Sequence, residues 1–136
     1  MTTNTGPWDI NALREPVSVT DLGKTLNGVT KITYTNEPYR GRSTSVFAFM
    51  SLPAASAYAQ DGKVPGIVLV HGGGGKAFEY WVRMWNDAGY AAIAMDLGGC
   101  DDTGMKLPDY GPNQEHDGKF DHLRLGVDQC WSYHAI

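Results

Sequence analysis

The stretch IVLVHGGGG at residues 67–75 decides the fold of this chain. Its first four residues are all apolar, which is typical of a strand buried on both faces of a parallel sheet. Four glycines follow after one histidine, and glycine has no Cβ and adopts positive φ readily. Such a loop lets backbone N–H groups approach a ligand closely. The stretch therefore predicts a buried strand at residues 67–70 that ends in an anion-binding loop.

An amphipathic helix is expected directly after the glycines. One face of this helix collects its apolar residues: Phe78, Trp81, Val82 and Trp85. That spacing makes Trp81 and Trp85 core residues rather than exposed aromatic groups that could stack on a ligand such as a sugar. Gly89 ends the helix, and residues 91–95 form a second buried strand. Residues 71–90 are long enough for one right-handed helical crossover, so the two strands should be parallel.

Two antiparallel strands are predicted before this unit. Residues 29–34 and 45–52 are rich in Val, Ile, Thr, Tyr and Phe, with turn residues between them. Residues 1–28 show no sustained period and are expected to form an extended arm with one short helix around residues 9–14. The predicted fold class is therefore α/β, with residues 29–136 as the single domain.

The segment after the second parallel strand has no periodicity from residue 97 to about 123. We expect it to be a loop over a site, because long loops in compact domains are usually functional or disordered. Tyr110 and Phe120 are its candidates for the rim of a substrate site. Acidic residues cluster near the carboxyl edge of the sheet, where ligands bind in open α/β folds: Asp96, Asp101 and Asp102. Capping of the loop is their simpler interpretation.

A helical stripe returns near the end of the sequence. It comprises Val127, Cys130, Trp131, His134 and Ala135. The sequence stops at Ile136 inside this stripe, without a helix cap or a following strand. We therefore expect the domain to be an N-terminal portion of a larger fold.

Three kinds of site use a glycine-rich loop after a strand. A P-loop requires Ser or Thr after Gly75-Lys76, where this chain has Ala77, so that interpretation fails. A dinucleotide fingerprint is formally satisfied by Gly72, Gly74 and Ala77, with Asp96 ending the next strand. The bulky residues that open the helix and the two antiparallel strands before the motif disfavour it, but spacing alone leaves this alternative open.

Acyl transfer is the third possibility. A tetrahedral oxyanion forms when a nucleophile attacks an ester, and His-Gly-Gly-Gly after a strand is the lipase and esterase form of the loop that stabilises it. The segment HGGGG at residues 71–75 matches this form. It makes the backbone N–H groups of Gly73 and Gly74 the candidate oxyanion donors. His71, Gly72 and Gly75 are expected to support the loop, and His71 is not expected to act as a base.

The chain resembles the acetylxylan-esterase-like and cephalosporin-deacetylase-like α/β hydrolases, which are related to dienelactone hydrolases. Five segments carry the resemblance: YRGR at residues 39–42, VFAF at 46–49, VPGIVLVHGGGG at 64–75, YWVR at 80–83 and AGYAAIAMD at 88–96. Residues 128–136 look like the start of the helix before the nucleophile strand. The resemblance implies the N-terminal part of an α/β-hydrolase fold and a Ser-His-Asp esterase that removes small acyl groups, such as acetyl, from sugars or similar alcohols. It implies no cofactor.

No nucleophile is identifiable in this sequence. The six serines lack the Gly-x-Ser-x-Gly context of a nucleophile elbow: Ser18, Ser43, Ser45, Ser51, Ser56 and Ser132. We therefore expect the chain alone to be inactive, and its triad to come from a C-terminal half. The alternative is a non-catalytic or complementing module, completed by another chain or a second copy.

Composition excludes several classes of partner. Eleven Lys and Arg against fifteen Asp and Glu give a net charge of −4, which disfavours nucleic acid. No apolar run is long enough for a secretion signal or a membrane span, so we expect a soluble, cytoplasmic protein. Two cysteines, Cys100 and Cys130, suggest reduced thiols rather than a disulfide framework.

The other reactive side chains are weaker candidates for a catalytic or metal-binding role. Cys100 has no identifiable partner base, so it is not expected to be a nucleophile. The remaining histidines and their neighbouring aspartates have irregular spacing, and we interpret them as solvated surface groups rather than metal ligands: His116, His122, His134, Asp117, Asp121 and Asp128. No metal site is predicted.

Overall fold

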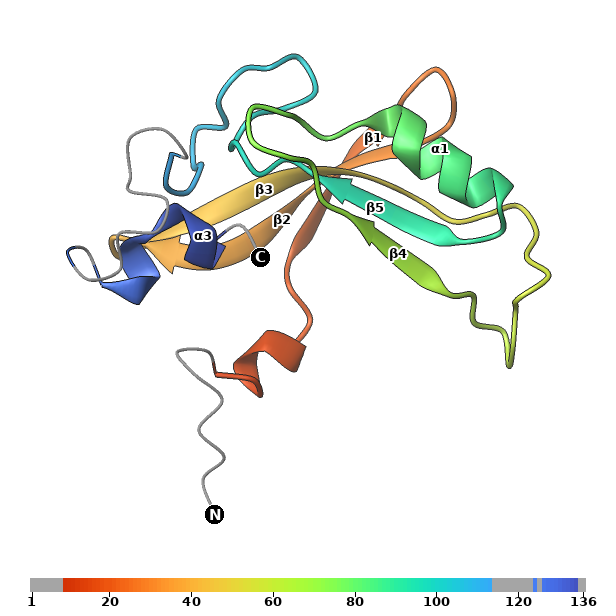
Figure 1. The fold of residues 1–136 in the computed structure, drawn as a ribbon, viewed down its shortest axis with the longest axis horizontal. Helices are drawn as coiled ribbons and strands as arrows, with labels where there is room; N and C mark the ends of the chain where they lie inside the picture. Colours follow the sequence, from red (N-terminus) through yellow and green to blue (C-terminus); the bar gives the residue numbers. More distant parts are fainter. Residues whose placement is uncertain (1–8, 114–123, 125, 135–136) are drawn as a thin grey trace.

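A computed structural model of the chain describes residues 9–113, 124 and 126–134. Its elements form one sheet with few helices (Figure 1). In chain order they are the 3-10 helix η1 (Ala12–Arg14), β1 (Val19–Lys24), β2 (Thr30–Tyr39), β3 (Arg42–Ser51), β4 (Gly66–Leu69), α1 (Glu79–Asp87), β5 (Ala91–Met95), the 3-10 helix η2 (Val127–Gln129) and α3 (Trp131–His134).

The five strands lie in the order β1-β2-β3-β5-β4. β4 and β5 are parallel, and every other neighbouring pair is antiparallel. The predicted hairpin of β2 and β3 and the predicted parallel unit of β4, α1 and β5 are both confirmed. The fold is thus of the α/β type, with a mixed sheet. Residues 97–113 contain no helix or strand, as predicted for the first part of the long loop.

The core lies between α1 and one face of the sheet (Figure 1). Val82 of α1 is fully buried there against Phe47 and Phe49 of β3 and against Ala92 and Ala94 of β5. Alternate strand residues face the same side, so the spacing of two in both strands directs these side chains toward the helix.

The two tryptophans of α1 differ in their packing. Trp85 is half-buried and packs against the core cluster, as predicted from its position in the helical stripe. Trp81 is also half-buried, but it lies against the ring of Phe78, with 4.8 Å between the ring centroids.

β4 is an edge strand, and one of its faces is exposed. Val68 is 61% exposed and Val70, just after the strand, is 58% exposed. The prediction that residues 67–70 are buried on both faces is therefore wrong. An apolar run shows that a strand can be buried, but burial also requires another element that covers it. Among the described residues, no helix covers β4 on the face of the sheet opposite α1.

β1 was not predicted, because it lies in the segment expected to be an arm. All six of its residues are exposed, and its register against β2 shifts between Asp21 and Lys24. It is held by backbone pairing rather than by apolar burial, so its sequence has no periodic apolar signal. The short helix expected near residues 9–14 is present as η1.

η2 and α3 cover part of the sheet face opposite α1. Trp131 and His134 lie with Tyr34 and Val46 around one small cavity. Val46 faces the side of the sheet away from α1, because it precedes Phe47, which packs toward α1, and neighbouring strand residues face opposite sides. Cys130 is buried and Val127 is 41% exposed, so the predicted stripe is only partly covered. Ala135 lies outside the described residues.

Candidate functional site

The glycine loop begins directly after β4, at the edge of the sheet where the two parallel strands end (Figure 1). The Gly75 N–H donates to the Gly72 carbonyl over 3.0 Å, which closes a tight turn. Gly74 has φ +74°, a conformation that residues with a Cβ rarely adopt. Gly72, Gly73 and Gly74 are exposed, so the turn presents backbone rather than side chains to solvent.

Gly75 is required by close packing. A Cβ at this position would lie 2.8 Å from His71 Nδ1 and 3.0 Å from the Gly72 carbonyl oxygen. Any side chain at residue 75 would therefore displace the His71 ring or open the turn.

His71 connects the two parallel strands. It is 7% exposed, its Nδ1 lies 2.7 Å from the Gly72 carbonyl, and its Nε2 accepts a hydrogen bond from the Leu97 N–H over 2.9 Å. Because Nε2 is an acceptor here, the proton of a neutral ring resides on Nδ1, which donates to Gly72. Both ring nitrogens are occupied by backbone groups, so His71 is placed to hold the loop rather than to move a proton.

The Gly73 N–H lies at the exposed tip of this turn. It donates no hydrogen bond to any residue that the structure describes. Gly74 does have an interaction partner. Gly73 thus offers an N–H group without a partner among the described residues.

The acidic residues near the site cap the following loop. Asp96 is 3% exposed, and its Oδ1 accepts from the N–H groups of Gly98 and Cys100 at 2.9 and 2.8 Å. Asp101 Oδ1 accepts from the hydroxyl of Thr103, over 2.6 Å, and this hydrogen bond is the main reason that the Asp101 pKa is lowered. Their interpretation as loop caps is confirmed.

Asp102 forms an ion pair with Lys31 of β2 rather than a loop cap. The distance from Lys31 Nζ to Asp102 Oδ2 is 3.1 Å, and both side chains are about 30% exposed. The pair attaches the loop after β5 to the sheet.

Cys100 carries a free thiol in a half-buried position. Burial raises its pKa, the nearby Lys106 ammonium opposes the rise, and Asp96 and Asp101 add to it. A raised pKa leaves little thiolate, which agrees with the expectation that Cys100 is not a nucleophile. Both Cys100 and Cys130 are free.

His134 is buried, and the interpretation of this residue as a solvated surface group is wrong. It is 7% exposed and its Nε2 lies 2.9 Å from the Asp128 carbonyl. Its place in the helical stripe was the better guide, because the face of a helix decides burial. Within the described ranges, no group of three or more His, Cys, Asp and Glu residues is arranged to hold a metal ion. The other histidines and aspartates considered as ligands lie outside those ranges: His116, His122, Asp117 and Asp121.

Tyr110 lies close to the start of the long loop. It is 38% exposed, and a Cβ on Gly99 would be 2.8 Å from the Tyr110 Cβ, so the ring rests on the backbone of Gly99. The Lys106 ammonium lies 5.1 Å from the centre of the ring. Phe120, the other rim candidate, lies outside the described residues.

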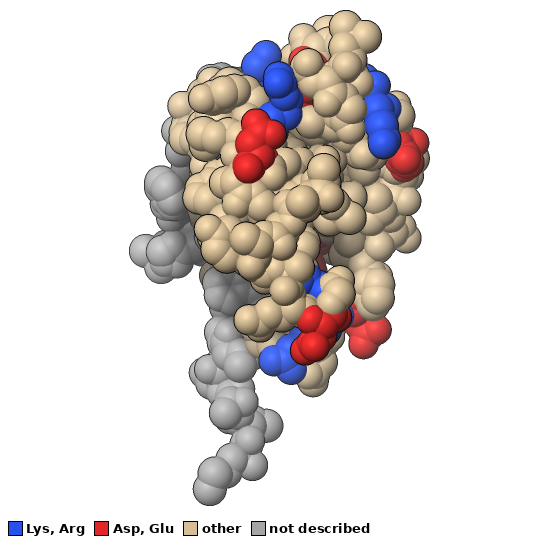
Figure 2. Space-filling view, turned by 90° about the vertical axis from the view of Figure 1, so that its right-hand side faces the viewer, with Lys and Arg blue, Asp and Glu red and all other residues tan. Residues whose placement is uncertain are grey.

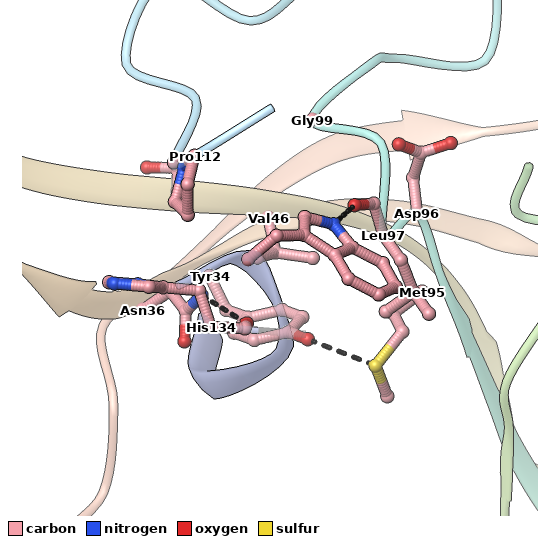
Figure 3. A pocket seen from close by; sticks show the side chains of 12 residues that line it. Tyr34, Asn36, Val46, Met95, Asp96, Leu97, Gly99, Pro112 and His134 are labelled. Atoms are coloured by element: carbon pink, nitrogen blue, oxygen red, sulfur yellow. Dashed lines mark hydrogen bonds between the residues drawn. The ribbon is translucent and has the colours of Figure 1, made fainter. Parts of the chain in front are cut away.

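Trp131 was not predicted to contribute to the site. Its indole Nε1–H donates to the Leu97 carbonyl over 2.8 Å, beside a cavity of about 130 Å³ (Figure 3). Leu97 thus has one backbone group bound by His71 and the other by Trp131. A contact between a side chain and a distant backbone group has no sequence signature, since any residue can supply the backbone.

None of the serine hydroxyls donates to a histidine in the part of the chain that the structure describes. Ser45 Oγ instead donates to Asp109 Oδ2 over 2.5 Å. These residues therefore contain no serine-histidine pair of the kind that activates a nucleophile.

Comparisons of the chain with models of protein families, with curated proteins and with solved structures found no match. Among the helices that the structure describes, none is long and apolar enough to cross a lipid bilayer. On the face drawn in Figure 2, positive and negative side chains lie near one another above and below a wide uncharged area.

Proposed function

We propose that this chain is the N-terminal part of a serine carboxylic ester hydrolase and supplies its oxyanion-hole loop. The proposed substrates are small acetyl esters of sugars or similar alcohols. The observation that carries the proposal is the loop itself. Gly73, in the loop after β4, presents an exposed N–H that has no partner among the described residues, and His71 holds the loop through hydrogen bonds to Gly72 and Leu97.

This geometry suits oxyanion stabilisation. Negative charge develops on the carbonyl oxygen of an ester when a nucleophile attacks it, and fixed N–H donors stabilise that charge without reorganising. The turn closed by Gly72 and Gly75 and the clamp by His71 fix the backbone of Gly73 before substrate binds. The second donor would be the N–H after the nucleophile serine.

The position of β4 at the edge of the described sheet supports the proposal, because a nucleophile strand could pair with it there. The opposite edge of the sheet, β1, carries Asp21 and Lys24 and an irregular register, features that prevent further pairing. β4 has only the residues Gly66, Ile67, Val68 and Leu69, with no charge or proline to block pairing. A strand added parallel to β4 would end beside the glycine loop, where its following residue meets the oxyanion donors.

The dinucleotide alternative is disfavoured by Asp96. In that type of site the acidic residue after the second strand binds the ribose. Here the Asp96 carboxylate is buried and accepts hydrogen bonds from Gly98 and Cys100, so it is not accessible to a ribose hydroxyl.

A non-catalytic module is the second candidate function. The observation that favours it is the lack of a serine-histidine pair among the described residues. The two functions differ in what joins the chain at β4: a strand with Gly-x-Ser-x-Gly for the esterase, and no such strand for the module.

The test is hydrolysis of 4-nitrophenyl acetate by two proteins. One is the 136-residue chain, and the other is this chain joined to, or mixed with, the polypeptide that carries Gly-x-Ser-x-Gly. We expect background rates from the first and turnover from the second, because donors without a nucleophile and base provide no covalent route. Turnover by the chain alone contradicts the proposal. So does a joined, folded protein that hydrolyses no small ester, and this result would favour the non-catalytic module.

A further inference from the structure

We propose that Trp131 is a positioning residue for the glycine loop and acts on it through the backbone of Leu97. Three hydrogen bonds connect them in series. Trp131 Nε1–H donates to the Leu97 carbonyl over 2.8 Å, and the Leu97 N–H donates to His71 Nε2 over 2.9 Å. His71 Nδ1–H then donates to the Gly72 carbonyl over 2.7 Å.

Leu97 is suited to be the junction because it lies just beyond the sheet. The last strand contact on this side is made by Asp96, whose N–H donates to the Phe47 carbonyl over 2.8 Å. One residue later the backbone has no strand partner, although a part-buried N–H and carbonyl still require hydrogen bonds. His71 satisfies the first of these groups and Trp131 the second, so both side chains determine where this residue lies.

α3 is itself fixed on the sheet, so the Trp131 indole has a defined position. Asn36 Nδ2 of β2 donates to the His134 carbonyl over 3.0 Å, and the edge of the His134 ring meets Tyr39 with 5.4 Å between centroids. The indole lines the same cavity as Val46, and its N–H donates to the Leu97 carbonyl.

α3 and the glycine loop lie on different parts of the sheet, and the Leu97 backbone is their shared contact. A shift of α3 displaces the Trp131 indole and, through its hydrogen bond, the Leu97 backbone. The Leu97 N–H is bonded to His71, so the position of the His71 ring changes as well. The element packed on the second face of the sheet thus sets the orientation of the Gly73 N–H. The catalytic consequence rests on the function proposed above, whereas the physical coupling does not.

The decisive experiment is amide hydrogen exchange by NMR on the ¹⁵N-labelled chain. Trp131→Phe removes the indole N–H and keeps an aromatic ring. Trp85→Phe makes the same change in α1, away from Leu97, and is the matched control. We expect Trp131→Phe to accelerate exchange of the Leu97 amide about fivefold, which corresponds to the loss of one ordinary hydrogen bond. The ¹⁵N shifts of the His71 ring should change as well.

A local effect distinguishes positioning from general destabilisation. Amides of the β2–β3 hairpin, such as that of Phe47, should exchange at the same rate in the wild type and in Trp131→Phe. Equal acceleration at Leu97 and Phe47, or an equal effect of Trp85→Phe at Leu97, overturns the proposal. An unchanged Leu97 amide and unchanged His71 shifts overturn it too.

Asn36→Ala keeps the test available if Trp131→Phe does not fold. This variant removes the hydrogen bond to the His134 carbonyl and leaves Trp131 in place, so α3 is loosened without loss of the indole. Leu97 exchange should then rise about twofold to threefold, less than for the loss of the direct bond. No change at Leu97 in a folded Asn36→Ala variant contradicts the coupling.

The activity measurement is separate. In the joined enzyme, Trp131→Phe should lower kcat for an acetyl ester about fivefold and leave KM within twofold, because the oxyanion donor acts in the transition state. If the enzyme has no esterase activity, the proposed function fails while the exchange result stands. If the activity exists and Leu97 exchange does not respond, the positioning role fails alone.

Discussion

His71 Nε2 accepts the Leu97 N–H over 2.9 Å, and this bond connects the loop after β4 with the residue beyond β5. The same ring binds the Gly72 carbonyl through Nδ1. One neutral imidazole thus binds two backbone groups from segments that are distant in sequence. The glycines allow the backbone to adopt the turn, and the two hydrogen bonds of His71 restrict it to one conformation.

We predict that His71→Ala lowers the free energy of unfolding by about 2–4 kcal/mol. The substitution leaves the part-buried Leu97 N–H without its partner, removes one of the two hydrogen bonds to the Gly72 carbonyl and creates a cavity. His71→Gln should cost about half as much, since its side-chain oxygen reaches the place of Nε2 and accepts from Leu97. Urea denaturation followed by circular dichroism measures both values. Equal losses for the two variants would show that the Leu97 contact contributes nothing.

The second prediction concerns the free edge of β4. The isolated chain should self-associate, because β4 pairs only with β5 among the described strands and exposes the side chain of Val68. Val68→Lys places a charge at this edge and should shift the chain toward the monomer. Sedimentation velocity over a concentration series measures the shift.

Leu22→Lys is the matched control for this experiment. Leu22 is 46% exposed on β1, whose edge is already irregular, so the added charge should not alter association. A wild-type chain that stays monomeric at every concentration, with a cooperative unfolding transition at high temperature, contradicts the prediction.

The third prediction is a slow reaction of Cys100 with iodoacetamide. Burial raises its pKa, so at a given pH less thiolate is present than in an ordinary cysteine, and alkylation should be several times slower than for a free thiol. Lys106 favours the thiolate, so Lys106→Ala should slow the reaction further. Rates are measured by mass spectrometry between pH 7 and 9, with Cys130→Ala as the background. Faster alkylation in Lys106→Ala would reverse the assigned sign.

Elements with a local apolar signal could be predicted from this sequence. β4, α1 and β5 follow from a short apolar run, a helical stripe and a second run, each of which is set by its own residues. β1 could not be predicted, because backbone pairing with β2 holds it and its side chains stay exposed. The exposed face of β4 was missed for a related reason: whether an apolar strand is covered depends on elements far away in sequence.

One part of the candidate site can likewise be predicted from the local sequence, and another part cannot. The turn at residues 71–75 is predicted by glycine and histidine, whose conformational properties are local. The partners of the loop, Leu97 and Trp131, are recognised only in the fold, since one contributes backbone atoms and the other was expected to be an ordinary helix residue. His134 shows that helical periodicity indicates burial better than the irregular spacing of histidines does.

The last prediction tests the oxyanion assignment in the joined enzyme. Gly73→Val should lower kcat for an acetyl ester by about a hundredfold or more, in line with the loss of one oxyanion donor. A β-branched side chain at the tip of the turn restricts the backbone that aims this N–H and occupies space where substrate binds. Gly66→Val is the matched control, because Gly66 lies in β4 with no atom within 4 Å of an added Cβ, and valine suits a strand. Steady-state kinetics with circular dichroism as the folding control decides the matter: unchanged kcat in a well-folded Gly73→Val enzyme removes Gly73 from the site, and an equal loss in Gly66→Val shows that the effect is not specific to the loop.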